Sequence, residues 1–139
     1  MRNAMDPNMT RKGKNQSSSI GCELGNLVNG RPHTWTVTPA TDIDAVADCI
    51  VEFFVSHGLP YLEKYSSPDA MFNLIAPNPE RPCLDSPFLD KRAINVVGLA
   101  LLLNRSQDIP CLVNQYEARL EAAYPFGLQG FRDFVAANV

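Results

Sequence analysis

Cys22 and His33 have the chemistry that most needs a test, because a cysteine beside a histidine can act as a nucleophile with its base. They flank Asn29-Gly30, a dipeptide that accepts the positive φ angles of a hairpin turn. In a two-residue hairpin centred there, Cys22 faces Val37 and His33 lies four positions further along the ladder. That separation is roughly 13 Å at about 3.3 Å per residue, too far for a hydrogen-bonded pair. The spacing therefore argues against this dyad, and no catalytic residue is predicted.

His57 is the second base that could approach Cys22. It precedes Gly58 at the end of a run of helical periodicity, where a histidine suits contact with the C-terminal dipole of a helix. A small enzyme that uses Cys22 with one of the two histidines is therefore the first alternative to a binding protein. A low thiol pKa at Cys22 would favour it.

Metal and cofactor sites are not indicated by the remaining side chains. Asp44, Asp48 and Glu52 lie four residues apart, so they share one helix face and could hold a hard cation through oxygen ligands. Such a stripe is more typical of a solvated face. The four cysteines form no C-x-x-C pair, and no glycine-rich phosphate loop or serine elbow is present. We predict no metal and no cofactor.

The charge of the chain is split unevenly. Residues 1–19 carry four basic side chains against Asp6, a net of +3, so the other 120 residues carry −6 of the total of −3. We expect residues 1–19 to be a disordered polar and basic tail. Binding of nucleic acid through this tail is the second alternative, although basic residues without interleaved aromatics make a poor site of that kind.

The fold class indicated by the periodicities is α+β, with one domain over residues 20–139. Residues 20–28 and 33–38 alternate as two strands of a short antiparallel hairpin. About five helices packed as antiparallel hairpins follow, over 41–57, 67–75, 86–104, 108–124 and 128–138. Thr41 is the predicted N-cap of the first, and the Ser-Pro pairs at 67–68 and 86–87 are predicted to start the next two. Gly58 and Pro60 end the first of these, with one or two short turns over 59–65, and residues 76–85 are a loop.

Two of these helices have informative apolar patterns. The first repeats apolar side chains at helical spacing, which predicts an inward face: Ile43, Val46, Ala47, Ile50, Phe53, Phe54 and His57. The helix over 86–104 is apolar nearly all round between Ala93 and Leu103, so we expect it to be surrounded by protein. Gly98 lowers its helix propensity, which predicts that another backbone passes close to that residue.

A resemblance to a known family comes from two short motifs. The run Gly30-Arg31-Pro32-His33-Thr34-Trp35, then an acid-capped helix and Leu59-Pro60-Tyr61-Leu62-Glu63, resembles the C-terminal half of an uncharacterised bacterial domain-of-unknown-function family. The resemblance spans about residues 20–125. It implies a helical C-terminal part and a shortened N-terminal part that lacks strands. It implies no activity and no site residues.

The hairpin leads to the functional hypothesis. An isolated two-stranded hairpin is marginally stable in water, and its edges expose unpaired backbone groups to other chains. We therefore expect a non-enzymatic protein–protein interaction module that forms a homodimer through the hairpin, with an interface of Cys22, Leu24, Leu27, Trp35 and Val37. No apolar run reaches the ~18 residues of a membrane span and no secretory signal is apparent, so we expect a cytoplasmic bacterial protein without membrane contacts.

Overall fold

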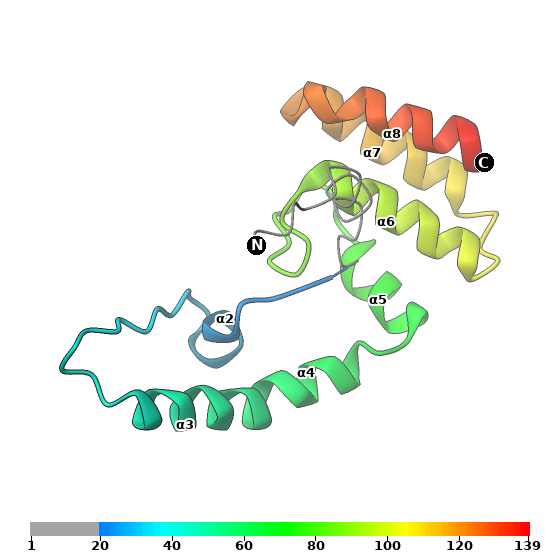
Figure 1. Ribbon diagram of the computed structural model, residues 1–139. Helices are drawn as coiled ribbons and strands as arrows, with labels where there is room; N and C mark the ends of the chain where they lie inside the picture. The colour runs from blue at the N-terminus through cyan, green and yellow to red at the C-terminus, as the bar shows by residue number, and fades with distance from the viewer. Residues whose placement is uncertain (1–19) are drawn as a thin grey trace, which may run out of the picture.

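The computed structural model describes residues 20–139, and every regular element in that range is a helix (Figure 1). In chain order the elements are α2 (Leu24–Asn29), α3 (Ile43–Phe53), the π-helical segment η2 (Phe54–Gly58), α4 (Leu59–Lys64), α5 (Pro68–Ile75), α6 (Leu89–Leu102), α7 (Ile109–Ala123) and α8 (Pro125–Asn138). The predicted α+β class is therefore wrong, because the described residues form an all-helical fold. The tail expected over residues 1–19 lies outside the described residues.

The predicted hairpin is replaced by helix α2 and an extended segment. Leu24, Leu27 and Val28 are half-buried at i, i+3 and i+4, which is helical spacing. Gly30 does have a positive φ of 68°, but there it caps α2, and its N–H donates to the Asn26 carbonyl at 3.0 Å. A left-handed glycine ends helices as readily as it turns hairpins. Residues 31–42 then run without strand partners among the described residues.

The extended segment returns along α2 at very close range. A Cβ built on Gly25 would lie 2.4 Å from the backbone nitrogen of His33, so only glycine fits there. Gly25 is accordingly one of the few fully buried residues in this part of the chain. The Asn29-Gly30 turn thus brings residues 31–33 against a helix and not against a second strand.

The first long helix continues past its predicted end. α3, η2 and α4 form one continuous helix of 22 residues, Ile43–Lys64. Gly58 and Pro60 do not stop it, because the Leu59 N–H donates to the carbonyl of Phe54, five residues back, and Pro60 then occupies the first turn of α4. Pro60 removes one backbone donor from the helix, and it does so directly after the π-helical turn, where the regular hydrogen-bond pattern is already interrupted.

Helix starts predicted from capping residues agree better with the structure than the predicted end of this first helix. Ser67 caps α5, with its Oγ accepting from the Ala70 N–H at 3.2 Å, as the Ser-Pro signal predicted. α3 begins one residue later than expected: Asp42 and not Thr41 is the N-cap, accepting from the Ala45 N–H at 3.1 Å. α6 begins at Leu89 without any side-chain cap, two residues after the predicted Ser86-Pro87 start.

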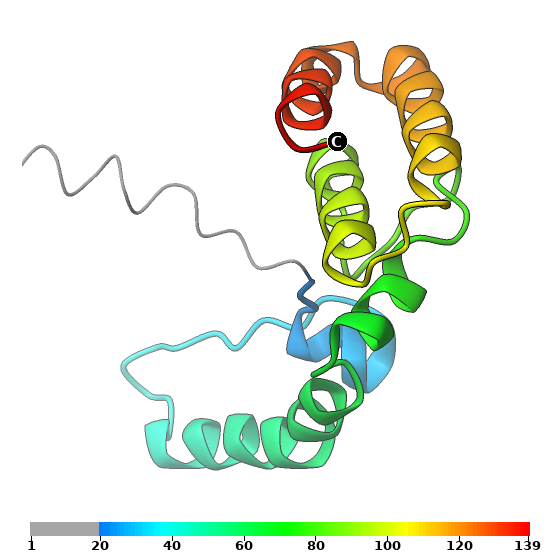
Figure 2. The same cartoon turned by 90° about the vertical axis from the view of Figure 1, so that its right-hand side faces the viewer.

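The hydrophobic core lies in the C-terminal bundle, which we define as α5 to α8 (Figure 2). α6, α7 and α8 pack on one another, and α5 packs on α6. The prediction that α6 is surrounded by protein is confirmed for Ala93, Val96, Val97 and Ala100, which are fully buried, but not for Leu102, which is 65% exposed. The expectation for Gly98 is wrong, because its nearest neighbour is a side chain, with Cζ of Phe134 3.8 Å from a built Cβ.

Arg92, on α6, is a buried charge in this bundle, with 3% of its surface exposed. Its guanidinium donates to four backbone carbonyls that end or follow α5: Ile75 at 2.7 Å, Pro77 at 2.6 Å, Asn78 at 3.4 Å and Arg81 at 2.9 Å. These include carbonyls left without partners at the end of a helix. Arg92 therefore fastens the loop that follows α5 to the start of α6.

Residues 20–66 form what we call the N-terminal arm, which contacts the bundle over a small region. Two hydrogen bonds to Asp85 join the arm to the rest of the chain. The Tyr61 hydroxyl donates to its Oδ1 at 2.8 Å, and the Gly21 N–H donates to its backbone carbonyl at 2.8 Å. Figure 1 shows the helix Ile43–Lys64 running beneath α2 and away from α6–α8. The arm is thus an extension and not part of the core.

Candidate functional site

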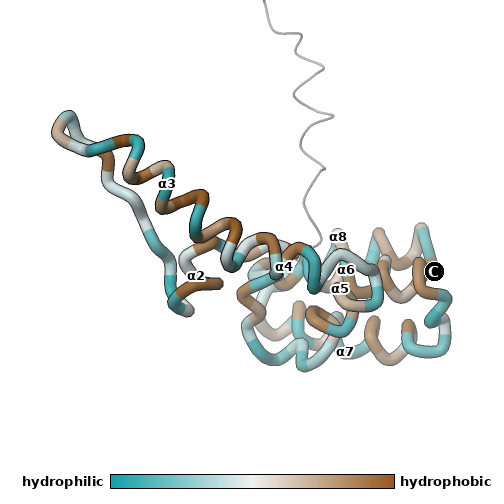
Figure 3. Tube along the Cα trace, turned by 90° about the horizontal axis from the view of Figure 1, so that it is seen from below, coloured by the Kyte–Doolittle hydropathy of each residue, from teal (hydrophilic) through white to brown (hydrophobic). Residues whose placement is uncertain are grey.

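The arm helix carries a row of exposed apolar side chains along its length, two of which, Phe54 and Leu62, also line the cavity between this helix and α2. We call this row the apolar face, and its members with their exposed fractions are Ile43 (63%), Ile50 (38%), Val51 (59%), Phe54 (44%), Val55 (53%), Leu59 (40%) and Leu62 (54%). No residue of α3 or α4 is fully buried. Figure 3 shows hydrophobic positions recurring along this helix where it projects from the bundle.

The π-helical segment keeps this face continuous along the helix. One extra residue in a turn rotates all later side chains by about 100° relative to an unbroken α-helix. That rotation brings Leu59 and Leu62 into line with Ile43, Ile50 and Phe54. The turn therefore aligns two short apolar stretches into one face nearly as long as the helix.

The opposite side of the same helix is covered by its own chain. The Trp35 ring lies 6.1 Å from that of Phe53 and 4.5 Å from that of His33, between ring centroids. Val46 and Cys49 are half-buried on the same side as Phe53. Because the extended segment 31–42 already covers this inner side, it is not available to cover the apolar face.

The estimated size of the apolar face lies near the upper end of what a monomer usually exposes. Side chains of this type with about half their surface exposed present roughly 100 Å² each. Seven of them give on the order of 700 Å², whereas the largest apolar patch on a typical monomer is about 300–600 Å². A standard protein interface buries about 800 Å² per partner, so this face alone approaches the size of one.

Charge is distributed unevenly along the helix. Asp44, Asp48 and Glu52 flank the apolar face in the N-terminal half, where Asp44, in the first turn, also interacts favourably with the positive end of the helix dipole. The C-terminal half carries His57 and Lys64 with Glu63. No group of three potential metal ligands is close enough to hold an ion among residues 20–139. The carboxylate stripe thus marks one end of the face as acidic.

The helix Ile43–Lys64 is long and apolar enough to cross a membrane by length and composition, although the sequence contains no unbroken apolar run of that length. An 18-residue window of it is only 6% buried. Asp48 and Glu52 lie within the helix, and a carboxylate near the centre of a bilayer costs about 3 kcal/mol. The distribution of charge favours a helix that docks sideways, with its acidic stripe in water.

The predicted interface residues lie mostly inside the arm. Cys22, Leu24 and Leu27 are half-buried and line a cavity of about 400 Å³ between α2 and the arm helix. Trp35 is half-buried on the inner side, where its Nε1 is shut off from water and has no hydrogen-bond acceptor. Val37 alone is largely exposed, at 60%. The hairpin that was to bring these five side chains together does not form.

The surroundings of Cys22 do not activate a thiol. Burial raises its pKa above the ordinary value, and the nearby carboxylates of Asp85 and Glu23 raise it further. His33 packs on the rings of Trp35 and Phe53. All four cysteines are free thiols. An elevated pKa is opposite to what a nucleophilic cysteine needs.

Comparison of the chain with protein-family models, with characterised proteins and with solved structures gives no match. The family resemblance expected from residues 30–35 and 59–63 stays a prediction. The site must therefore be judged on its geometry. Sequence reasoning found the periodicity of the arm helix but read it as one inward face. It overlooked the width of the apolar surface of this helix, because apolar side chains occur on two of its sides and the acidic side chains occupy only a narrow stripe.

Proposed function

We propose that this protein is an interaction module that forms a homodimer by pairing the apolar faces of two arm helices. The observation that carries the proposal is the row from Ile43 to Leu62, whose members stay 38–63% exposed although α2 lies beside Phe54 and Leu62. Its estimated area fits one side of a standard interface. A second copy is the occupant favoured here, because an identical face supplies a matching length of apolar surface.

The charge distribution favours an antiparallel pair. In a parallel pair, Asp44, Asp48 and Glu52 would lie beside the same carboxylates of the partner and repel them. In an antiparallel pair about a twofold axis, that acidic half lies beside the half containing His57 and Lys64. The helix dipoles also oppose each other in this arrangement. The axis then passes close to Phe54, near the middle of Ile43–Lys64.

The first test is the solution mass of the full chain, measured by light scattering after size exclusion over a range of micromolar concentrations. We expect a dimer of about 30 kDa, twice the chain mass of 15.3 kDa. The double variant Val51→Glu/Leu62→Glu places two carboxylates in the apolar face at side chains that are more than half exposed. It should be a folded monomer, because each buried carboxylate would lose its hydration without gaining a partner.

A matched control adds the same charge away from the face. Asn73→Glu/Gln107→Glu also adds two negative charges at exposed residues, but in the C-terminal bundle and the loop before α7. It should remain a dimer. A monomeric wild-type chain, or a dimer that survives Val51→Glu/Leu62→Glu, would refute the proposal. If the monomer instead cosediments with phosphatidylcholine vesicles and the double variant does not, the apolar face is a membrane-surface site and the homodimer is wrong.

A further inference from the structure

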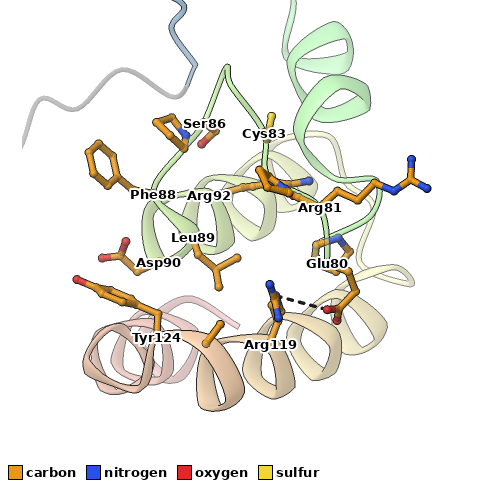
Figure 4. A pocket seen from close by; sticks show the side chains of 14 residues that line it. Glu80, Arg81, Cys83, Ser86, Phe88, Leu89, Asp90, Arg92, Arg119 and Tyr124 are labelled. Carbon is orange, nitrogen blue, oxygen red and sulfur yellow. Dashed lines mark hydrogen bonds and ion pairs between the residues drawn. The ribbon is translucent and has the colours of Figure 1, made fainter.

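We infer that a second site, in the C-terminal bundle, binds a small ligand with an apolar body and an anionic head such as a carboxylate. The site is a cavity of about 440 Å³ between the loop that precedes α6 and the C-terminal end of α7 (Figure 4). That volume lies in the range of about 300–1,000 Å³ that small-molecule sites occupy. It is separate from the apolar face, since none of the lining residues belongs to the arm.

The walls of the cavity are mainly rigid and apolar. Three prolines of the loop form one wall, and the other side carries Leu89, Ala123 and Tyr124. Phe88 lines the cavity although 70% of its surface is exposed. Proline and ring side chains lose little conformational entropy when a ligand covers them, which suits a preformed site. The apolar body of the ligand would lie against these walls.

Positive charge in the cavity comes from two arginines that approach it from different helices. Arg92 lines it from α6, and its buried guanidinium has backbone carbonyls but no carboxylate as partners among residues 20–139. The end of α5 offsets this charge only in part, because a helix terminus carries about half a unit. A buried cation without a counter-ion raises the affinity of the cavity for an anion.

Arg119 supplies the group that would meet the anion. It projects from α7 into the cavity, as Figure 4 shows, and its Nε is shut off from water without a hydrogen-bond acceptor. The nearest carboxylate, that of Glu80, is 3.4 Å from Nε, forms no hydrogen bond with it, and belongs to a side chain that is 72% exposed. Glu80 can turn outward into water. A ligand carboxylate could then accept a hydrogen bond from the guanidinium.

The net charge of the lining supports an anionic ligand over a cationic one. The lining contains three positive side chains, Arg81, Arg92 and Arg119, and two negative ones, Glu80 and Asp90, so its net charge is +1. Residues 20–139 as a whole carry −6, the total of −3 less the +3 of residues 1–19. A positive cavity in an otherwise acidic part of the chain selects for negative ligands.

The experiment compares acid and amide probes of equal shape by calorimetry and ligand-observed NMR on the full chain. The acids are benzoate, octanoate and 4-phenylbutyrate, each paired with its neutral amide. We expect at least one acid to bind tenfold or more tightly than its amide. Arg119→Gln should bind that acid and its amide equally, whereas Arg132→Gln, which removes an exposed arginine of α8, should keep the preference.

A second pair of variants locates the binding in the cavity. Ala123→Leu fills the wall of the cavity, while Ala122→Leu adds the same bulk at the exposed neighbour that does not line it. Only the first should abolish binding of the acid. If no acid binds at millimolar concentration, if the amides bind equally well, or if the preference survives in folded Arg119→Gln, the inference is overturned. Circular dichroism confirms that each variant is folded.

Discussion

At the scale of single residues, the least expected feature is that one arginine organises the C-terminal bundle. The buried guanidinium of Arg92 holds the carbonyls of Ile75, Pro77 and Arg81. Arg92→Met keeps much of the volume but leaves those acceptors without donors, so we expect a loss of about 3 kcal/mol in the free energy of unfolding. Urea denaturation measures it.

The control is Arg132→Met, which breaks only the exposed ion pair with Glu117 and should lower the free energy of unfolding by less than about 1 kcal/mol. Equal losses in the two variants would contradict the role of Arg92.

Tyr116 makes the stability of the same region depend on pH. Burial raises its pKa from 10 to about 12, while nearby Arg92 opposes the rise, and its hydroxyl donates to the Ile75 carbonyl at 3.1 Å. The folded state holds this proton more tightly than the unfolded state. Its contribution is therefore complete below pH 10 and is lost as the pH rises toward 12. Over that window the free energy of unfolding of the wild type should fall by about 2–3 kcal/mol more than that of Tyr116→Phe. At neutral pH the variant itself should be about 1 kcal/mol less stable than the wild type. Parallel urea curves at each pH test this, and identical pH slopes would contradict it.

At the scale of elements, local signals predicted helix starts better than they distinguished helix from strand. Ser67 caps a helix wherever the rest of the chain lies, because the accepting hydroxyl oxygen and the donating Ala70 N–H are only three residues apart. Asn29-Gly30 is different, since a positive φ suits both a hairpin turn and a helix end. The choice depends on what packs there. The close approach of His33 to Gly25 decides it, and that contact is not visible in the sequence.

The arm helix gives the element-scale prediction, which concerns the direction of pairing. If two arm helices pair antiparallel about their midpoint, a cysteine at Phe54→Cys lies near the same residue of the partner. The arm helix is about 33 Å long. In this arrangement the cysteines of two Ile43→Cys chains therefore lie at opposite ends of the pair. With the exposed Cys111 replaced by serine, mild oxidation should link Phe54→Cys into covalent dimers, seen on non-reducing gels, and leave Ile43→Cys unlinked. Linking at both positions would indicate parallel pairing, because each residue of a parallel pair lies beside its own copy.

At the scale of the whole molecule, the sequence predicted the core better than the surface. The apolar segment of α6 indicated burial because few arrangements leave such a helix exposed. The apolar face was missed because helical periodicity predicts an apolar stripe but does not say whether the chain itself covers it. The cavity between the loop and α7 was missed for a related reason, since Arg92 and Arg119 are far apart in sequence and only packing brings them to one space.

Hydrogen exchange of the full chain tests how the two parts share stability. The backbone of α6–α8 surrounds the buried core, so its amides should exchange slowly at every protein concentration. The helix Ile43–Lys64 has little burial of its own, so its slow exchange should appear only at concentrations where the dimer forms. Diluting the protein should therefore speed exchange in the arm and leave α6–α8 unchanged. Slow exchange in the arm of a dilute monomer would mean that residues 31–42 and α2 stabilise this helix alone, and the case for pairing would lose its physical basis.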